Sequence, residues 1–181
     1  MGVNMKKVTI SGLAGSGTST LVQGIAKHFG WASINGGQIF RDEADVRGLT
    51  LTEFNDLCSS DESVDLELDE SLRQYILNDE TNIIESRLAG WWAYKLGCDS
   101  IRIWLDVNNK ERALRVANRE GMRLEEAFAT NATRQSVQNE RYQKMYGLIP
   151  EDPTPYTHII DATDITAEQV LNEAIRILGD E

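Results

Sequence analysis

Hydrophobic and polar positions follow two different periods along this chain. Short apolar runs predict strands at residues 6–11, 32–35, 82–85, 101–107 and 158–161. Apolar residues at helical spacing predict amphipathic helices at residues 19–29, 38–47, 51–58, 64–77 and about 167–178. The largest helical interval covers residues 110–146 and carries the densest set of arginines. Strands that alternate with helices in this way indicate an α/β fold with a parallel sheet.

The whole chain is predicted to form one domain. Its 181 residues are about one domain's worth of chain, and no repeat, linker or low-complexity tract interrupts them. We therefore expect a single unit over residues 1–181, with a central parallel sheet flanked by helices. Several helical segments follow one another between residues 38 and 77, so this part is expected to stand apart from the regular alternation.

A glycine-rich loop lies between the first predicted strand and the helix that follows it. The stretch GLAGSGTST fits the phosphate-loop pattern G-x-x-x-x-G-K-[ST] at Gly12, Gly17 and Ser19, but Thr18 stands at the lysine position. Because a strand delivers this loop to a helix N-terminus, its backbone amides can face a phosphate. A glycine turn without a ligand is the alternative, which this context disfavours. The expected ATP-binding residues here are Gly12, Gly15, Ser16, Gly17, Thr18, Ser19 and Thr20.

Two charged residues follow the strand predicted at residues 82–85. Glu85 ends the run NIIE, which places a carboxylate at the carboxyl edge of the sheet, where open α/β sheets bind ligands. With the Ser19 hydroxyl it is a candidate for holding Mg²⁺, through water. A solvent-facing glutamate explains the same position, but Arg87, two residues later, favours a phosphate site.

Arginines recur in patterns that suit phosphate binding. Arg41 follows Gly36 and Gly37 by about one helical turn, and like Arg87 it is a candidate for the acceptor phosphate. Two helical pairs add to the set, spaced four and seven residues apart: Arg115 with Arg119, and Arg134 with Arg141. A solvated surface arginine is the ordinary reading of each one alone. Six together, in a chain this acidic, indicate a phosphate-binding cluster.

Composition excludes several classes of partner. The formal net charge of −11 disfavours broad binding to nucleic acid or to an anionic membrane. Cys58 and Cys98 lie far apart and form neither a disulfide framework nor a zinc site. No leader and no long apolar span is seen. We expect a cytoplasmic monomer that binds small nucleotides.

Several segments together resemble one enzyme family. The chain is similar to the cytidylate kinases of the short, archaeal type, within the nucleoside monophosphate kinases. The resemblance spans nearly the whole length and is carried by TISGLAGSGTSTL, GGQIFRDEADVRGLTLTEF, IIESRLAGW, RIWL, ERALRVANREG and ERYQKMYG. It implies a P-loop nucleoside triphosphate hydrolase fold with a helical NMP-binding region near residues 36–79 and a short lid near residues 119–134.

The resemblance also implies roles for the arginines. Arg41 and Arg87 would hold the CMP phosphate, next to Gly36 and Gly37 in the acceptor region. Arg115 and Arg119 resemble the arginines that grip ATP at the lid base. Arg134 and Arg141 resemble the pair that bridges donor and acceptor phosphates, so Arg87, Arg119, Arg134 and Arg141 form the expected catalytic set.

The choice of base is predicted from a periodic acidic face. Asp61, Asp65 and Asp69 recur every four residues, and Arg73 continues the series. A carboxylate can accept a hydrogen bond from the cytosine amino group and an arginine can donate to the ring, so Asp65, Asp69 and Arg73 are hypotheses for cytosine recognition. A solvated acidic face explains the same spacing equally well.

Two positions depart from the family pattern. Thr18 replaces the loop lysine, and Gln138 stands where bacterial cytidylate kinases place an aspartate. The sequence predicts a Mg²⁺-dependent kinase that moves the γ-phosphate of ATP to CMP or dCMP, with Arg119 and Arg134 partly substituting for the lysine. Three alternatives remain open: a kinase for AMP or UMP, a nucleotide-binding sensor that has lost catalysis, and a disfavoured nucleic-acid-binding P-loop ATPase.

Overall fold

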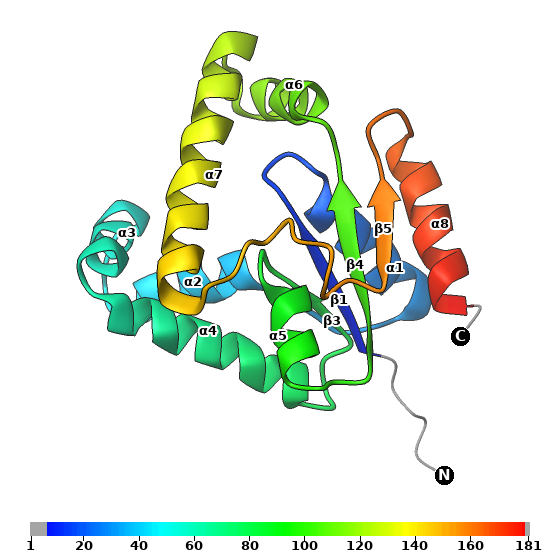
Figure 1. Cartoon of the computed structure of the whole chain (residues 1–181), viewed down its shortest axis with the longest axis horizontal. Coiled ribbons are helices and arrows are strands. Elements are labelled where there is room, and N and C mark those ends of the chain that lie inside the picture. Colours follow the sequence, from blue (N-terminus) through cyan, green and yellow to red (C-terminus); the bar gives the residue numbers. More distant parts are fainter. Residues whose placement is uncertain (1–6, 180–181) are drawn as a thin grey trace.

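The computed structural model describes residues 7–179 of the chain. A five-stranded sheet forms the centre, with the strand order β2-β3-β1-β4-β5 and every pair of neighbours parallel. Helices cover both faces of this sheet (Figure 1). The parallel sheet predicted from the sequence is therefore confirmed. Lys6, the first residue of the first predicted strand, lies outside the described residues.

The elements follow the predicted segments closely. The strands are β1 (Lys7–Gly12), β2 (Ser33–Asn35), β3 (Ile83–Glu85), β4 (Ser100–Asp106) and β5 (His158–Asp161). The helices are α1 (Thr18–Phe29), α2 (Gly36–Val46), α3 (Leu51–Ser60), α4 (Glu62–Leu77), α5 (Ala89–Lys95), α6 (Asn109–Glu120), α7 (Leu124–Tyr146) and α8 (Ala167–Gly179).

The long helical interval at residues 110–146 is divided into two helices. Gly121 caps the C-terminal end of α6, has a φ of +67° and donates its N–H to the carbonyl of Ala117. A left-handed residue at this position favours glycine, because a side chain would be strained there. α7 then begins at Leu124, where the carboxylate of Glu126 accepts from the backbone N–H of Arg123 at 3.1 Å, and runs for 23 residues. The arginines of this interval therefore sit on two helices.

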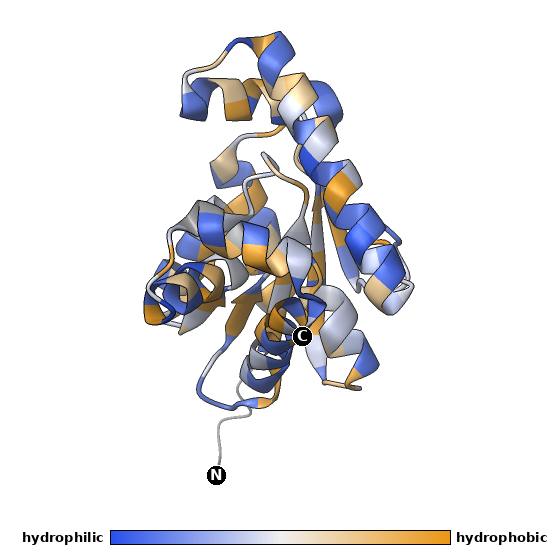
Figure 2. Ribbon diagram, turned by 90° about the vertical axis from the view of Figure 1, so that its left-hand side faces the viewer, coloured by the Kyte–Doolittle hydropathy of each residue, from blue (hydrophilic) through white to orange (hydrophobic). Residues whose placement is uncertain are grey.

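Successive residues of the strands supply the two faces of the sheet. Ile83 belongs to the core that α1 and α8 cover, whereas its neighbour Ile84 belongs to the core under α4, α5 and α7. This is the consequence of side chains alternating across a strand. Both isoleucines are fully buried, as expected for a parallel sheet enclosed on both sides. Figure 2 shows apolar residues gathered in the sheet and on helix faces turned toward it.

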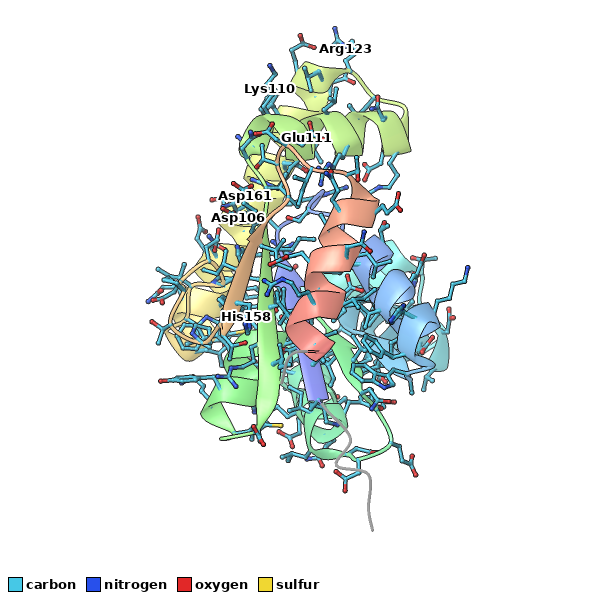
Figure 3. All side chains as sticks on the ribbon, turned by 90° about the vertical axis from the view of Figure 1, so that its right-hand side faces the viewer. Asp106, Lys110, Glu111, Arg123, His158 and Asp161 are labelled. Carbon is cyan, nitrogen blue, oxygen red and sulfur yellow. The ribbon has the colours of Figure 1, made fainter. Side chains whose placement is uncertain are left out.

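The carboxyl ends of the strands meet at one edge of the sheet. Asp106 at the end of β4 pairs in register with Asp161 at the end of β5, while His158 lies at the opposite end of β5 (Figure 3). The loop after β1, Asn35 and Glu85 lie at this carboxyl edge too, because β2, β3 and β1 are neighbours in the same parallel sheet. α6 and the first half of α7 extend past this edge (Figure 1).

Two smaller apolar clusters hold the helices that leave the sheet. One joins α2, α3 and α4 around the fully buried Phe54. The other joins α6 to α7 around Val116 and Ala127. In the part of the chain that the structure describes, no helix is both long and apolar enough to cross a membrane.

The contact between α5 and the segment before β5 generates a stability prediction. A methyl group added at Gly90 would lie 2.4 Å from Cε1 of Tyr156, whose ring packs against Trp104. We expect Gly90→Ala to lower the free energy of unfolding by roughly 1–3 kcal/mol, because overpacking forces the ring or helix to shift. Urea denaturation measures this.

The matched control is Gly179→Ala, also at a helical position. Among residues 7–179 nothing lies within 4 Å of the methyl group that this change adds, so it should leave stability nearly unchanged or slightly raised. Equal effects of the two substitutions would contradict the packing argument.

Candidate active site

A cavity of about 950 Å³ opens at the carboxyl edge of the sheet. Its walls come from the loop after β1, the start of α2, one face of α4, the end of β3, and the facing sides of α6 and α7. We call it the larger cavity. Cavities of this size at this edge are the usual ligand sites of open α/β sheets. Segments that are far apart in the sequence therefore share one site.

The glycine loop presents the N-terminus of α1 to this cavity. Gly15 and Gly17 have φ angles of +85° and +91°, a backbone conformation that favours glycine. In the part of the chain that the structure describes, no side chain caps α1, and the first turn of this helix holds no acidic residue. The backbone N–H groups and the positive end of the helix dipole therefore suit an anion such as a phosphate.

The residues of the glycine loop that were predicted to bind ATP lie on two sides of this loop. Six of them line the larger cavity: Gly12, Gly15, Gly17, Thr18, Ser19 and Thr20. Ser16 instead lies buried on the opposite side of the loop, where its hydroxyl has no hydrogen-bond partner within the described chain. Among the described residues no lysine lines the cavity. The positive charge that a lysine at position 18 would supply is therefore not provided there by another ammonium group.

Glu85 joins the loop to the neighbouring strands. The Ser19 hydroxyl donates to its Oε1 at 3.0 Å, and Nδ2 of Asn35 donates to its Oε2 at 2.5 Å. Asn35 also caps α2, because its Oδ1 accepts from the N–H of Gln38. The carboxylate is buried and fixed in place, which does not fit the solvent-facing alternative. Sequence reasoning missed Asn35, although its place at the end of a short run before Gly36 is a signal.

Arg87 is the most distinctive cation of the larger cavity. Within residues 7–179 its guanidinium makes no hydrogen bond or ion pair, although it lines the cavity. Burial lowers the pKa of this group, while Tyr142, Glu151 and Tyr156 partly offset the effect. Arg87 is half-buried, and a partly desolvated cation without an ion-pair partner is unfavourable unless an anion arrives. The position is therefore suited to a ligand phosphate.

Three further predicted arginines line the same cavity from α6 and α7. Arg119 and Arg134 both contact Oε1 of Glu120, at 2.7 and 3.4 Å, and both are largely exposed. The hydrogen bond from Arg119 and the one from Arg134 lower the pKa of Glu120, so this carboxylate stays charged between them. Arg141 pairs with Asp65 at 3.1 Å. The structure thus brings four predicted catalytic arginines to one cavity.

Not all of the residues that were predicted to bind the acceptor nucleotide line the larger cavity. Gly36 and Gly37 begin α2 and line the larger cavity. Arg41 is not among its lining residues and donates to Oε1 of Gln38 at 3.0 Å on an exposed face. Arg73 also lies outside the lining, with its guanidinium 4.0 Å from the ring centre of Trp92 and paired with Glu70.

Arg115 lines a second, smaller cavity of about 320 Å³ behind the loop. Its guanidinium donates to the carbonyl of Ser16 at 3.2 Å and to that of Ala162 at 2.8 Å, and pairs with Glu111 at 2.8 Å. Ser16, Thr20 and the start of α8 also line this cavity. Arg115 and Arg119, although spaced four apart, therefore face different cavities.

The acidic face of α4 is not uniformly solvated. Asp61 is exposed and caps the helix by accepting from the N–H of Ser63, whereas Asp65 and Asp69 line the larger cavity. Asp65 is buried, and the hydroxyl of Tyr146 donates to Oδ2 of Asp69. Burial raises the pKa of both carboxyl groups. The solvated-face alternative therefore holds for Asp61 alone.

Sequence reasoning also missed a buried arginine and Tyr142 of α7, and it named Gln138 only as a departure from the family pattern. Arg112 lies under the loop, and its Nη1 donates to the carbonyl of Ala14 at 3.2 Å. Tyr142 lines the larger cavity, and Gln138 does so with an Oε1 that has no partner among the described residues. Helical spacing from Arg134 and Arg141 was a signal for Gln138, but none marked Arg112 as buried.

A phosphate loop at the edge of a parallel sheet, facing arginines on two helices, defines a P-loop kinase. A family model described as AAA domain matches residues 8–141. Among solved structures, an uncharacterized protein from Eubacterium ventriosum aligns with a TM-score of 0.75 at 13% identity, covering 97% of this chain and 99% of that one. A gluconokinase from Sinorhizobium meliloti aligns with a TM-score of 0.63 at 16% identity, covering 97% and 93%. These likenesses show the fold.

Curated relatives narrow the class. A cytidylate kinase of Thermococcus kodakarensis is 44% identical over 85% of this chain and 78% of its own. One from Pyrococcus abyssi is 42% identical over 90% of this chain and 88% of its own, and one from Halobacterium salinarum is 41% identical over 82% and 77%. The chain belongs to the cytidylate kinase family, which confirms the resemblance seen in the sequence.

The buried carboxyl group of Asp69 generates a prediction about pH. Its pKa is raised above the ordinary value of 3.8, chiefly by burial, so the native state holds its proton to higher pH than the unfolded state does. Stability from this group is therefore present at low pH and is lost as pH rises above about 4 through the folded pKa. We expect Asp69→Asn to raise the free energy of unfolding at pH 7 more than at pH 4.

Urea denaturation of both proteins at several pH values between 4 and 7.5 measures this difference. The matched control is Glu70→Gln, because Glu70 is the exposed neighbour on α4 and its pKa is lowered by hydrogen bonds from Gln74 and Arg73. That control should show the opposite sign. An Asp69→Asn effect that does not change with pH would contradict the assignment.

Proposed function

We propose that the chain transfers the γ-phosphate of ATP to CMP or dCMP, giving ADP and CDP or dCDP. The observation that carries the proposal is a single cavity in which the uncapped N-terminus of α1 faces four arginines, one of them without a partner. Two phosphate groups can be held there together, which a transfer between nucleotides requires. The cytidylate kinase relatives support CMP as the acceptor.

The donor nucleotide would lie along the glycine loop. Its phosphates would face the amides of Gly15 and Gly17 and the first turn of α1. We place the adenine ring in the smaller cavity, beside Arg115 and Thr20. A guanidinium can stack on an aromatic base, so the predicted contact of Arg115 with ATP fits this cavity.

The donor set beside the loop fits Mg²⁺. The Ser19 hydroxyl and the Glu85 carboxylate are oxygen donors in direct contact, and such donors suit this small, hard cation. Ser19 would bind the ion and Glu85 would hold its water, while Asn35 keeps the carboxylate oriented. When bound, the ion neutralises charge on the phosphates.

The acceptor would lie between α4 and the end of β3. Arg87 would hold its phosphate, because it is half-buried, lines the cavity and is unpaired within residues 7–179. Asp65 and Asp69 lie across from it on α4, where a carboxylate can accept from the cytosine amino group. Arg41 and Arg73 would have to turn toward the cavity to take part, since neither lines it.

The transfer step needs electrostatic positioning and no general base. The attacking atom is an oxygen of the acceptor phosphate, which is already ionised at neutral pH. Arg119, Arg134 and Arg141 would surround the transferring group and stabilise its charge. Closure of residues 119–134 and residues 36–79 over the nucleotides would exclude water and limit hydrolysis of ATP. We place the enzyme in the cytoplasm as a monomer.

One assay distinguishes the proposed function from two alternative functions. We offer ATP and Mg²⁺ with CMP, dCMP, UMP, AMP or GMP, beside a control without acceptor, and measure ADP. Selective turnover with CMP and dCMP is expected. Turnover with AMP or UMP instead would move the assignment to another nucleotide, and tight binding without turnover would support the sensor alternative.

The base-reading assignment is tested in the same assay. An Asp69→Asn variant should lose part of the preference for CMP over UMP, because its amide can also donate. An unchanged ratio in this variant and in Asp65→Asn would retire the assignment of both residues.

The α6 and α7 arginines generate a further prediction. Arg119→Ala and Arg134→Ala should each lower kcat by roughly 100-fold, since each removes a charge aimed at the transferring group. The matched control is Arg123→Ala, whose side chain pairs with Glu126, lies outside both cavities and is labelled in Figure 3. It should retain normal turnover. If both cavity variants turned over like the control, these arginines would not substitute for the lysine.

A further inference from the structure

Arg112 is buried on the side of the phosphate loop that faces away from the larger cavity. Its Nη1 donates to the carbonyl of Ala14 at 3.2 Å, while Ala14 itself lines the cavity. Arg112 does not line either cavity. Its guanidinium therefore contacts the loop without lining either cavity.

The backbone of Arg112 also holds the loop. A methyl group at Gly15 would lie 2.6 Å from the carbonyl oxygen of Arg112, so the loop and α6 are in direct contact at this point. Three residues later on the same helix, Arg115 donates to the carbonyl of Ser16. Two arginines spaced one turn apart therefore hold successive parts of the loop from behind.

The charge of Arg112 is not neutralised by an ion pair. Among residues 7–179 no carboxylate lies within ion-pair distance of it, and its Nε is buried without a partner. Its Nη2 contacts only amide oxygens, of Asn109 and Gln135, each at 3.3 Å. Burial and the nearby charge of Arg87 lower its pKa. A buried charge of this kind becomes favourable when an anion binds close by.

A second chain of contacts links Arg112 to α7. Gln135 accepts from Arg112 and donates to Oε1 of Glu151 at 2.6 Å, and Asn139 donates to the same oxygen at 3.3 Å. Gln135 follows Arg134 directly on α7. The loop and the helix that carries two cavity arginines are thus joined through one guanidinium.

We propose that Arg112 is a positioning residue that holds the phosphate loop. Its positive charge acts through the loop and replaces part of the charge that a lysine at position 18 would supply in the cavity. This inference rests on the proposed function, because it concerns how the donor phosphates are held. A lysine at position 18 would offer its charge from the cavity side, and Arg112 offers charge from the buried side of the same loop.

The first test separates charge from hydrogen bonding. We compare Arg112→Gln, which can still donate to Ala14, with Arg112→Lys, which keeps the charge. Because Arg112→Gln removes a charged contact, we expect this variant to bind ATP about 10-fold or more weakly. Its kcat should be lower, and its KM for CMP should be nearly normal. Arg112→Lys should keep most of the wild-type affinity. Calorimetry with ATP alone and steady-state kinetics provide these numbers.

The matched control is Arg102→Gln. Arg102 also clamps backbone carbonyls, those of Pro155 at 2.5 Å and Ser100 at 2.9 Å, but it lies outside both cavities. It should lower thermal stability without changing ATP affinity. If Arg112→Gln behaves like this control, or if Arg112→Lys falls as far as Arg112→Gln, the proposal is overturned.

A compensation test addresses Thr18 directly. Thr18→Lys should restore ATP affinity in the Arg112→Gln background, and should add less in the wild-type background, where Arg112 already acts. Equal gains in both backgrounds would show that the two charges are independent, which contradicts the proposal.

A further variant keeps the proposal testable if Arg112→Gln does not fold. Glu151 raises the pKa of Arg112, and one of its carboxylate oxygens has no hydrogen-bond partner among the described residues. Glu151→Gln keeps the shape and removes the negative charge, so ATP should bind several-fold more tightly. Unchanged or weaker binding would overturn the proposal. Wild-type transfer to CMP is measured in parallel: its absence would sink the proposed function, while ATP affinities would still decide the role of Arg112.

Discussion

Uncompensated positive charge at the edge of the sheet is the constraint on which the rest of the site depends. The chain carries a formal charge of −11, yet the half-buried Arg87 and the buried Arg112 have no ion-pair partner in the described structure. Burying such charges is unfavourable in the absence of an anion. The fold tolerates them because two large apolar cores on the faces of the sheet hold the surrounding elements. Stability elsewhere therefore supports a site prepared for phosphate.

The parallel sheet explains why the charges meet at one place. Because all strands run in the same direction, the loop after β1, Asn35 and Glu85 arrive at the same edge. The backbone amides of the loop need no side chain to bind an anion, which makes the loss of one lysine tolerable. Arginines then approach from three directions: from the end of β3, from α7 across the cavity, and from α6 on both sides of the loop.

Much of the fold and part of the site could be predicted from the sequence. Strand and helix periodicity located every strand, and the spacing of Arg134 and Arg141 placed both on one face of α7, where the structure shows them lining the cavity. Spacing was insufficient for Arg115 and Arg119, which line different cavities because Arg115 donates to the carbonyls of Ser16 and Ala162. Arg112 could not be distinguished, since burial under a loop depends on contacts between distant segments.

The sequence by itself determined the class of fold, the glycine loop and the family, because these depend on local periodicity and on contiguous motifs. Tertiary structure alone decided which charges are exposed and which are buried. Asp61 and Asp65 have the same spacing and chemistry, yet one caps a helix in solvent and the other pairs with Arg141 inside the cavity. The physical reason is that the energy of a charged side chain depends on its burial and on nearby charges, and these are set by residues far apart in the chain.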